Sequence, residues 1–153
     1  MKNVILIVAL FLASSAWCAP YQVAAWTFGD SASLQAASDR AAIDEVDIDW
    51  YVSQRNLSVK GSGVDRSFVS AAHARGIKVF ATVSNYSDSL GDFDPDLASG
   101  ILAGKASSNK HISAIVSLCM AGGYDGVDLD WEALHPADRN RFSVFVTSLA
   151  KQS

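Results

Sequence analysis

Three carboxylates recur at every second position in the segment Asp125-Gly-Val-Asp-Leu-Asp-Trp-Glu132. On a β-strand, alternate side chains share one face, so Asp128, Asp130 and Glu132 are predicted to stand in a file, about 7 Å apart. Mutual repulsion and partial desolvation raise the pKa of at least one member of such a file. A carboxyl that keeps its proton near neutral pH can protonate a leaving-group oxygen, as glycoside hydrolysis requires. Glu132, at the C-terminal end of the strand, is the predicted general acid.

A second segment, Asp44-Glu-Val-Asp-Ile-Asp-Trp-Tyr51, repeats this pattern but ends in tyrosine and so lacks the proton donor. Its alternation predicts that Asp49 and Tyr51 face the same side of the sheet as the acids, where they are candidate substrate contacts; core or structural roles are the alternative. Trp26 is a further candidate, because an indole ring stacks well on a sugar face, although an aromatic residue on such a strand is more often part of the core.

Other chemistry is not indicated by the sequence. The histidines are dispersed without metal-ligand spacing, so we expect no metal and no cofactor, and we predict His73 and His111 at helix surfaces. The net charge of −4 and the absence of a basic cluster argue against nucleic acid as a partner. Cys119 lies in an apolar run and is predicted to be a buried structural thiol.

The elements that must position these residues follow a βαβα rhythm, which is typical of a parallel sheet covered by helices. Apolar runs rich in β-formers alternate with segments of helical periodicity. The predicted strands are Tyr21–Phe28, Ile43–Val52, Ile77–Val83 and Tyr124–Glu132. The predicted helices are Ser31–Ala41, Val64–Arg75, Ser108–Ala121 and a last one that Pro136 opens. We therefore expect an α/β fold with four strand–helix units.

The segment at 125–132 matches the DGxDxDxE signature of glycoside hydrolase family 18, the chitinases and related enzymes, residue for residue. The runs 77–86, 123–126 and 136–142 resemble the branch that contains spore-cortex and peptidoglycan-cleaving members. In this family the signature lies on the fourth strand of a TIM (β/α)₈ barrel, and here it falls on the fourth predicted strand. The resemblance thus implies the first half of such a barrel, truncated after the fourth unit, because the whole barrel usually needs about 250 residues.

What the resemblance implies for the site is specific. Glu132 would donate its proton to the glycosidic oxygen and later act as base toward water, while the acetamide of the substrate forms the intermediate, an exception to two-carboxylate hydrolysis. Asp130 would orient that acetamide, Asp128 would share a proton with Asp130, and Asp125 and Gly126 would be structural. The implied substrate is an N-acetylglucosamine-containing polysaccharide, either chitin or peptidoglycan.

The sequence also departs from the family pattern. Ser84-Asn85-Tyr86-Ser87 stands where members usually carry Ser-x-Gly-Gly, and Asn85 is a candidate substrate contact there. The later strands that complete the family's subsite have no counterpart before Ser153, so this chain alone is expected to be weak or inactive. A non-catalytic carbohydrate-binding relative and a non-functional fragment are the alternatives; endo or exo action and the oligomeric state stay open.

The first residues resemble an export signal. Lys2 precedes the apolar run Val4–Leu12, and Ala16 and Cys18 fit the −3 and −1 positions of a cleavage site. We predict a signal peptide at 1–18 and a partial family 18 catalytic domain at 19–153. The apolar run is too short to span a bilayer, so we expect no stable membrane anchor and a location outside the cell or in its envelope.

Overall fold

The computed structural model describes residues 23–27, 29, 34–35, 43–61 and 65–152. The predicted signal peptide and most of the predicted helix at 31–41 lie outside these residues, as do the side chains of Asp49 and Trp50. In the described part, no helix is long and apolar enough to cross a membrane.

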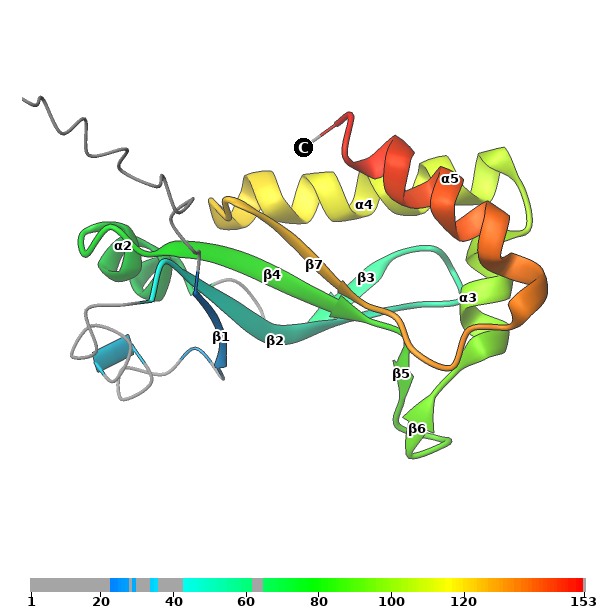
Figure 1. The fold of residues 1–153 in the computed structure, drawn as a ribbon, viewed down its shortest axis with the longest axis horizontal. Coiled ribbons are helices and arrows are strands. Elements are labelled where there is room, and N and C mark those ends of the chain that lie inside the picture. Colours follow the sequence, from blue (N-terminus) through cyan, green and yellow to red (C-terminus); the bar gives the residue numbers. More distant parts are fainter. Residues whose placement is uncertain (1–22, 28, 30–33, 36–42, 62–64, 153) are drawn as a thin grey trace, which may run out of the picture.

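A twisted sheet forms the centre of the molecule (Figure 1). Its four parallel strands are adjacent in chain order, and β3 (Val59–Gly61) pairs antiparallel with the end of β2. The parallel strands are β1 (Ala24–Thr27), β2 (Glu45–Ser53), β4 (Lys78–Ser84) and β7 (Gly126–Asp130). Each of them overlaps a predicted strand, and the predicted parallel sheet is confirmed.

The helical segments of the described part include those predicted at 64–75, at 108–121 and after Pro136. They are α2 (Arg66–His73), α3 (Pro95–Leu102), α4 (Lys105–Gly122), the short 3₁₀ helix η1 (Pro136–Asp138) and α5 (Arg139–Leu149). Asp94 caps α3 by accepting a hydrogen bond from the Leu97 amide, 2.9 Å away. Gly123 ends α4 with φ of 74°, a conformation that glycine adopts without steric penalty. The first turn of α4 precedes the predicted start at Ser108.

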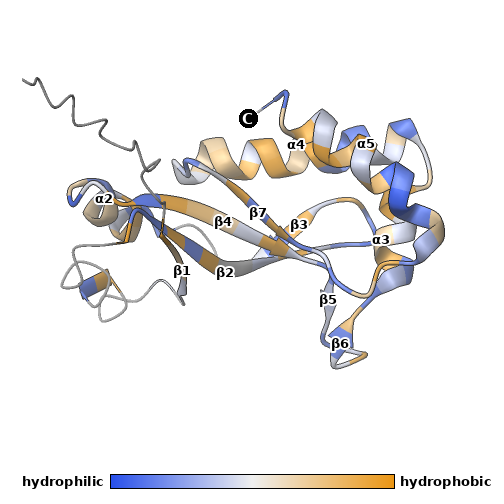
Figure 2. Cartoon of the chain, in the orientation of Figure 1, coloured by the Kyte–Doolittle hydropathy of each residue, from blue (hydrophilic) through white to orange (hydrophobic). Residues whose placement is uncertain are grey.

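The helices cover one face of the sheet. Apolar residues of the strands pack there against α2, α4 and α5, and Figure 2 shows apolar stretches on β4 and α4. The fully buried apolar strand residues on this side are Val46, Ile48, Val79, Ala81 and Val83. Figure 1 shows α4 and α5 along this face, and no helix of the described part lies along the opposite face. The opposite face of the sheet is called the open face below.

A register shift in β2 corrects one prediction. Asp49 pairs with Thr82 and Tyr51 with Val83, so two steps along β2 correspond to one step along β4. Such a bulge reverses the alternation of side chains beyond it. Tyr51 is therefore 3% exposed in the helix-side core, where its hydroxyl lies 2.7 Å from the Tyr124 hydroxyl. The prediction that Tyr51 faces the same side as the acids is wrong.

A small hairpin follows β4 at the carboxyl end of the sheet (Figure 1). Its strands are β5 (Tyr86–Ser87) and β6 (Asp92–Phe93), and the rings of Tyr86 and Phe93 make an edge-to-face contact with centroids 5.8 Å apart. Leu90 at its turn is 61% exposed. The sequence patterns do not predict this hairpin, because its strands have two residues each.

Candidate active site

The file of acids on β7 lies on the open face. Val127 and Leu129 pack against the helix-side core, and the following Trp131 stacks on Phe145 of α5 with ring centroids 5.1 Å apart. Since side chains alternate along a strand, the intervening aspartates point to the other side. Asp128 and Asp130 are half-buried, and Glu132 is exposed.

Neighbouring strands add polar groups to this file. The Thr82 hydroxyl on β4 donates to the Asp128 carboxylate at 3.3 Å. Ser84 is paired in register with Asp130, so the two residues stand side by side at the carboxyl end of their strands. The open face at this end therefore carries two carboxylates with hydroxyl-bearing neighbours, immediately before the exposed Glu132.

Asp47 on β2 is the acid with the clearest electrostatic perturbation in the described part. The pKa of Asp47 is raised to about 6, above all by burial and also by the nearby carboxylates of Glu45 and Asp128. Only 7% of the residue is exposed, and its Oδ1 has no hydrogen-bond partner. The sequence places Asp47 in phase with Asp49 but gives no reason to single it out, since its burial depends on the neighbouring strands.

The two residues that open the signature have contacts that support a structural role. The Asp125 carboxylate accepts hydrogen bonds from the Val79 amide and from Nε2 of His73, both at 2.8 Å. It thereby ties the start of β7 to β4 and to α2. At Gly126 an added Cβ would lie 2.4 Å from Cε1 of Phe80, so the Phe80 ring requires the absence of a side chain there.

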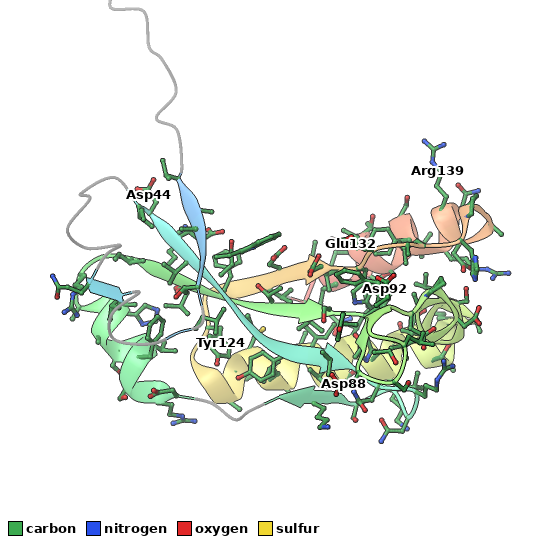
Figure 3. The ribbon with its side chains drawn as sticks, turned by 90° about the horizontal axis from the view of Figure 1, so that it is seen from below. Asp44, Asp88, Asp92, Tyr124, Glu132 and Arg139 are labelled. Atoms are coloured by element: carbon green, nitrogen blue, oxygen red, sulfur yellow. The ribbon has the colours of Figure 1, made fainter. Side chains whose placement is uncertain are left out.

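Glu132 stands two residues beyond the end of β7. Figure 3 shows it at this end of the strand, with Tyr124 at the opposite end. The side chain of Asn85, which follows β4, makes two hydrogen bonds to the Glu132 backbone and one to Asp94. Asn85 is 0% exposed. The amide of Asn85 is thus enclosed and bonded to protein groups, which favours a structural role, and direct contact with substrate stays a prediction.

The structure places the other candidates as follows. Trp26 is 71% exposed, and its backbone pairs with Asp47 of β2, so it shares the open face. Asp49 occupies an open-face register position opposite Thr82, while its side chain lies outside the described residues. Cys119 is half-buried, in line with the predicted structural thiol, and burial raises its pKa.

His111 corrects a further prediction. The residue is 0% exposed and not at a helix surface. Its Nδ1 donates to the Leu57 carbonyl and its Nε2 accepts from the Ser53 hydroxyl, both at 3.1 Å. Burial lowers the pKa of His111, so the ring is held neutral. His73, by contrast, is exposed as predicted.

Among the residues that the structure describes, no group of three or more His, Cys, Asp or Glu side chains is arranged to hold a metal ion. The exposed Glu132 carboxyl and the half-buried Asp128 and Asp130 can together give and take protons. This is the arrangement that protonation of a leaving group and charge stabilisation at a neighbouring centre require.

Comparison with known proteins gives a consistent result. No family model matches the chain. The chain is 29% identical over 122 residues to the uncharacterized glycosylase YvbX of Bacillus subtilis, a match that covers 79% of this chain and 35% of that protein. A chitinase from Chromobacterium violaceum has a similar structure with a TM-score of 0.72, at 25% identity over 86% of this chain and 41% of that one. The spore cortex-lytic enzyme SleL of Bacillus cereus shares the fold, with a TM-score of 0.70 at 21% identity over 84% of this chain and 31% of that one.

The chain thus spans well under half the length of these proteins. Sequence similarity to a glycosylase, structural similarity to chitinases and the acid signature on a parallel strand all agree. The chain is similar to a glycosylase and to chitinases, in agreement with its resemblance to the glycoside hydrolases of family 18.

Proposed function

We propose that this chain carries the acid–base machinery of a glycosidase that cleaves β-linked N-acetylhexosamine polymers, with Glu132 as general acid and then general base. The observation that carries the proposal is the file of Asp128 and Asp130 on the open face, which leads to an exposed Glu132 at the carboxyl end of a parallel strand. In folds of parallel strands and helices, active sites form at this end of the strands.

In the proposed reaction, the Glu132 carboxyl protonates the glycosidic oxygen as the bond to the anomeric carbon breaks. The acetamide oxygen of the substrate attacks that carbon from the other side, which gives an oxazolinium intermediate with inverted configuration at the anomeric carbon. Water then attacks from the face that the leaving group left, so the product regains the original configuration. Glu132, now a carboxylate, takes a proton from the water that opens the oxazolinium ring. Because the residue is exposed, a polymer can reach it.

Asp130 and Asp128 support the substrate's acetamide in this proposal. Asp130 orients the amide and stabilises the positive charge that develops on it, while Asp128 shares a proton with Asp130. The Thr82 hydroxyl, bonded to Asp128, holds that carboxylate in the file. Asp47, whose pKa is raised to about 6, adds a proton-holding group next to Asp128.

The requirement for an acetamide defines the substrate class as chitin or the glycan strands of peptidoglycan. Trp26, exposed on the same face, is a candidate platform for a sugar ring, and Asp49 is a candidate polar contact. We further propose that residues 19–153 form the first four β/α units of a (β/α)₈ catalytic domain, and that residues 1–18 direct export to the cell exterior or envelope.

Hydrolysis of a fluorogenic chitobiose-type substrate tests the proposal, with this chain and with a longer form that extends past Ser153. Glu132→Gln is expected to lower kcat by at least about 10³-fold, because the general acid is removed. The control is Asp96→Asn, which neutralises an exposed carboxylate in the first turn of α3 and should keep activity within about threefold. Cleavage that survives Glu132→Gln would contradict the assignment.

A further inference from the structure

The backbone of Glu132 lies outside the regular sheet. The last pair of the β4–β7 ladder joins Ser84 and Asp130, so the peptide groups of Glu132 have no partner strand in the described part. The next residue, Ala133, has φ of 53°, a left-handed conformation that is unfavourable for a residue with a side chain. A sharp turn therefore follows directly after the proposed general acid, and regular structure does not hold it in place.

The Asn85 side chain takes the place of a partner strand. Its Oδ1 accepts a hydrogen bond from the Glu132 amide at 2.9 Å, and its Nδ2 donates to the Glu132 carbonyl at 3.0 Å. These two bonds fix the peptide groups on both sides of the Glu132 Cα. The direction of the Cα–Cβ bond, and with it the starting point of the carboxyl side chain, is set by the same contact.

Asn85 is itself held firmly. Its Nδ2 also donates to the Asp94 carbonyl at 3.1 Å, and its own carbonyl accepts from the Asp94 amide at 2.9 Å. The Asp94 carboxylate caps α3 and accepts from Arg55 at 2.5 Å. Both N–H groups and the oxygen of the Asn85 amide are therefore used in a fully buried position.

We propose that Asn85 is a positioning residue that holds the backbone of Glu132 and so aims its carboxyl at the glycosidic oxygen. The inference rests on the proposed function of Glu132 and deepens it. An amide is the group that the site requires, because it donates to two carbonyls and accepts from one N–H. An aspartate at position 85 would turn an acceptor oxygen toward the carbonyls of Asp94 and Glu132 and add a buried negative charge.

The experiment compares Asn85→Asp and Asn85→Ala with the unchanged chain. Asn140→Asp, the same change on the exposed surface of α5, is the matched control. The first measurement is hydrogen exchange at the Glu132 amide, resolved by NMR. It should be protected in the unchanged chain and exchange about tenfold faster or more in both Asn85 variants, while the amides of α4 keep their protection.

The second measurement is cleavage of the chitobiose-type substrate, by this chain or by the longer form that extends past Ser153, whichever is active. Both Asn85 variants should lower kcat by about 100-fold and leave KM within about threefold, because a misplaced carboxyl impairs the reaction more than binding. Asn140→Asp should change neither quantity.

The outcomes separate this inference from the proposed function. An unprotected Glu132 amide in the unchanged chain overturns the positioning role, whether or not any variant folds. Folded Asn85 variants with full protection or full kcat overturn it too. Activity that survives Glu132→Gln, or that is absent from both forms, refutes the proposed function, and amide exchange then still decides whether Asn85 holds the Glu132 backbone.

Discussion

Asp47 shows how a single residue couples the open face to the stability of the fold. Its pKa is about 6 in the folded chain, against an ordinary value of 3.8, because burial and two neighbouring carboxylates oppose its ionisation. A group whose pKa rises on folding stabilises the fold only while it keeps its proton. The contribution of Asp47 is thus present below about pH 4 and is lost as the pH rises through 6.

Replacement by asparagine should remove this dependence. We expect Asp47→Asn to raise the free energy of unfolding at pH 7.5 by about 1–3 kcal/mol, because the buried charge is eliminated. Near pH 4, where the native carboxyl is protonated, the two proteins should be equally stable within about 0.5 kcal/mol. Urea unfolding at both pH values measures the difference, with the exposed Asp88→Asn as control. A gain that is the same at both pH values would show that ionisation is not its cause.

At the scale of elements, β2 and β7 have nearly the same alternation of acidic and apolar residues, but the two strands differ in which face of the sheet their last residues occupy. In β7 the alternation continues unbroken over the described strand, so the sequence is sufficient to predict which residues face the helices. In β2 the shift between Asp49 and Tyr51 moves the tyrosine to the core. Nothing in the local sequence signals this bulge, because the Tyr124 and α2 contacts that stabilise it come from distant segments.

The contact between β4 and β7 gives a test at the same scale. Gly126→Ala should destabilise the chain by about 1–3 kcal/mol, because its methyl group would overlap the Phe80 ring. Gly100→Ala on α3 is the control; nothing lies within 4 Å of its added Cβ, so it should be neutral or slightly stabilising.

A double variant makes this prediction specific. Phe80→Leu in the Gly126→Ala background should recover part of the loss, since the smaller side chain gives the methyl group room. Chemical unfolding of the four members of the cycle measures the coupling. Strictly additive changes would mean that the ring and the methyl group do not compete for the same space.

At the scale of the whole molecule, the sequence is informative where a pattern is local. The parallel strands, the helices α2, α4 and α5 and the acid file follow from periodicity and residue type. The interior position of His111 does not follow from a local pattern, because its two hydrogen-bond partners, Ser53 and Leu57, lie far away in the chain. The sequence indicates Asn85 as a site residue because it follows a predicted strand. Its contact with the Glu132 backbone is not predictable in this way, because it forms only when the segments after β4 and β7 approach each other in the fold.

His111 connects the sheet layer to the helix layer, so its protonation should affect global stability. Its pKa is lowered from 6.5 by burial, so the unfolded chain takes up the proton first as the pH falls. The stability that His111 contributes is therefore present above pH 6.5 and is lost as the pH drops below it.

Comparison with His111→Gln isolates this effect, because the contribution of Asp47 is common to both proteins. At pH 7.5 the unchanged chain should be more stable by about 1–3 kcal/mol, owing to its two hydrogen bonds and its ring contacts. This difference in stability between the two proteins should become smaller toward pH 5, and thermal unfolding measures it. A constant gap across this range would contradict a neutral buried ring.

The enclosed amide of Asn85 has a practical consequence for producing the protein. Asn85-Tyr86-Ser87 also fits the acceptor sequence for N-linked glycosylation. A glycan replaces one of the two hydrogens on this nitrogen, so one of the Asp94 and Glu132 carbonyls would lose its donor, and the glycan cannot fit in a fully buried site. Expression through a eukaryotic secretory pathway would therefore trap modified chains before they fold, whereas a bacterial host without this modification would not.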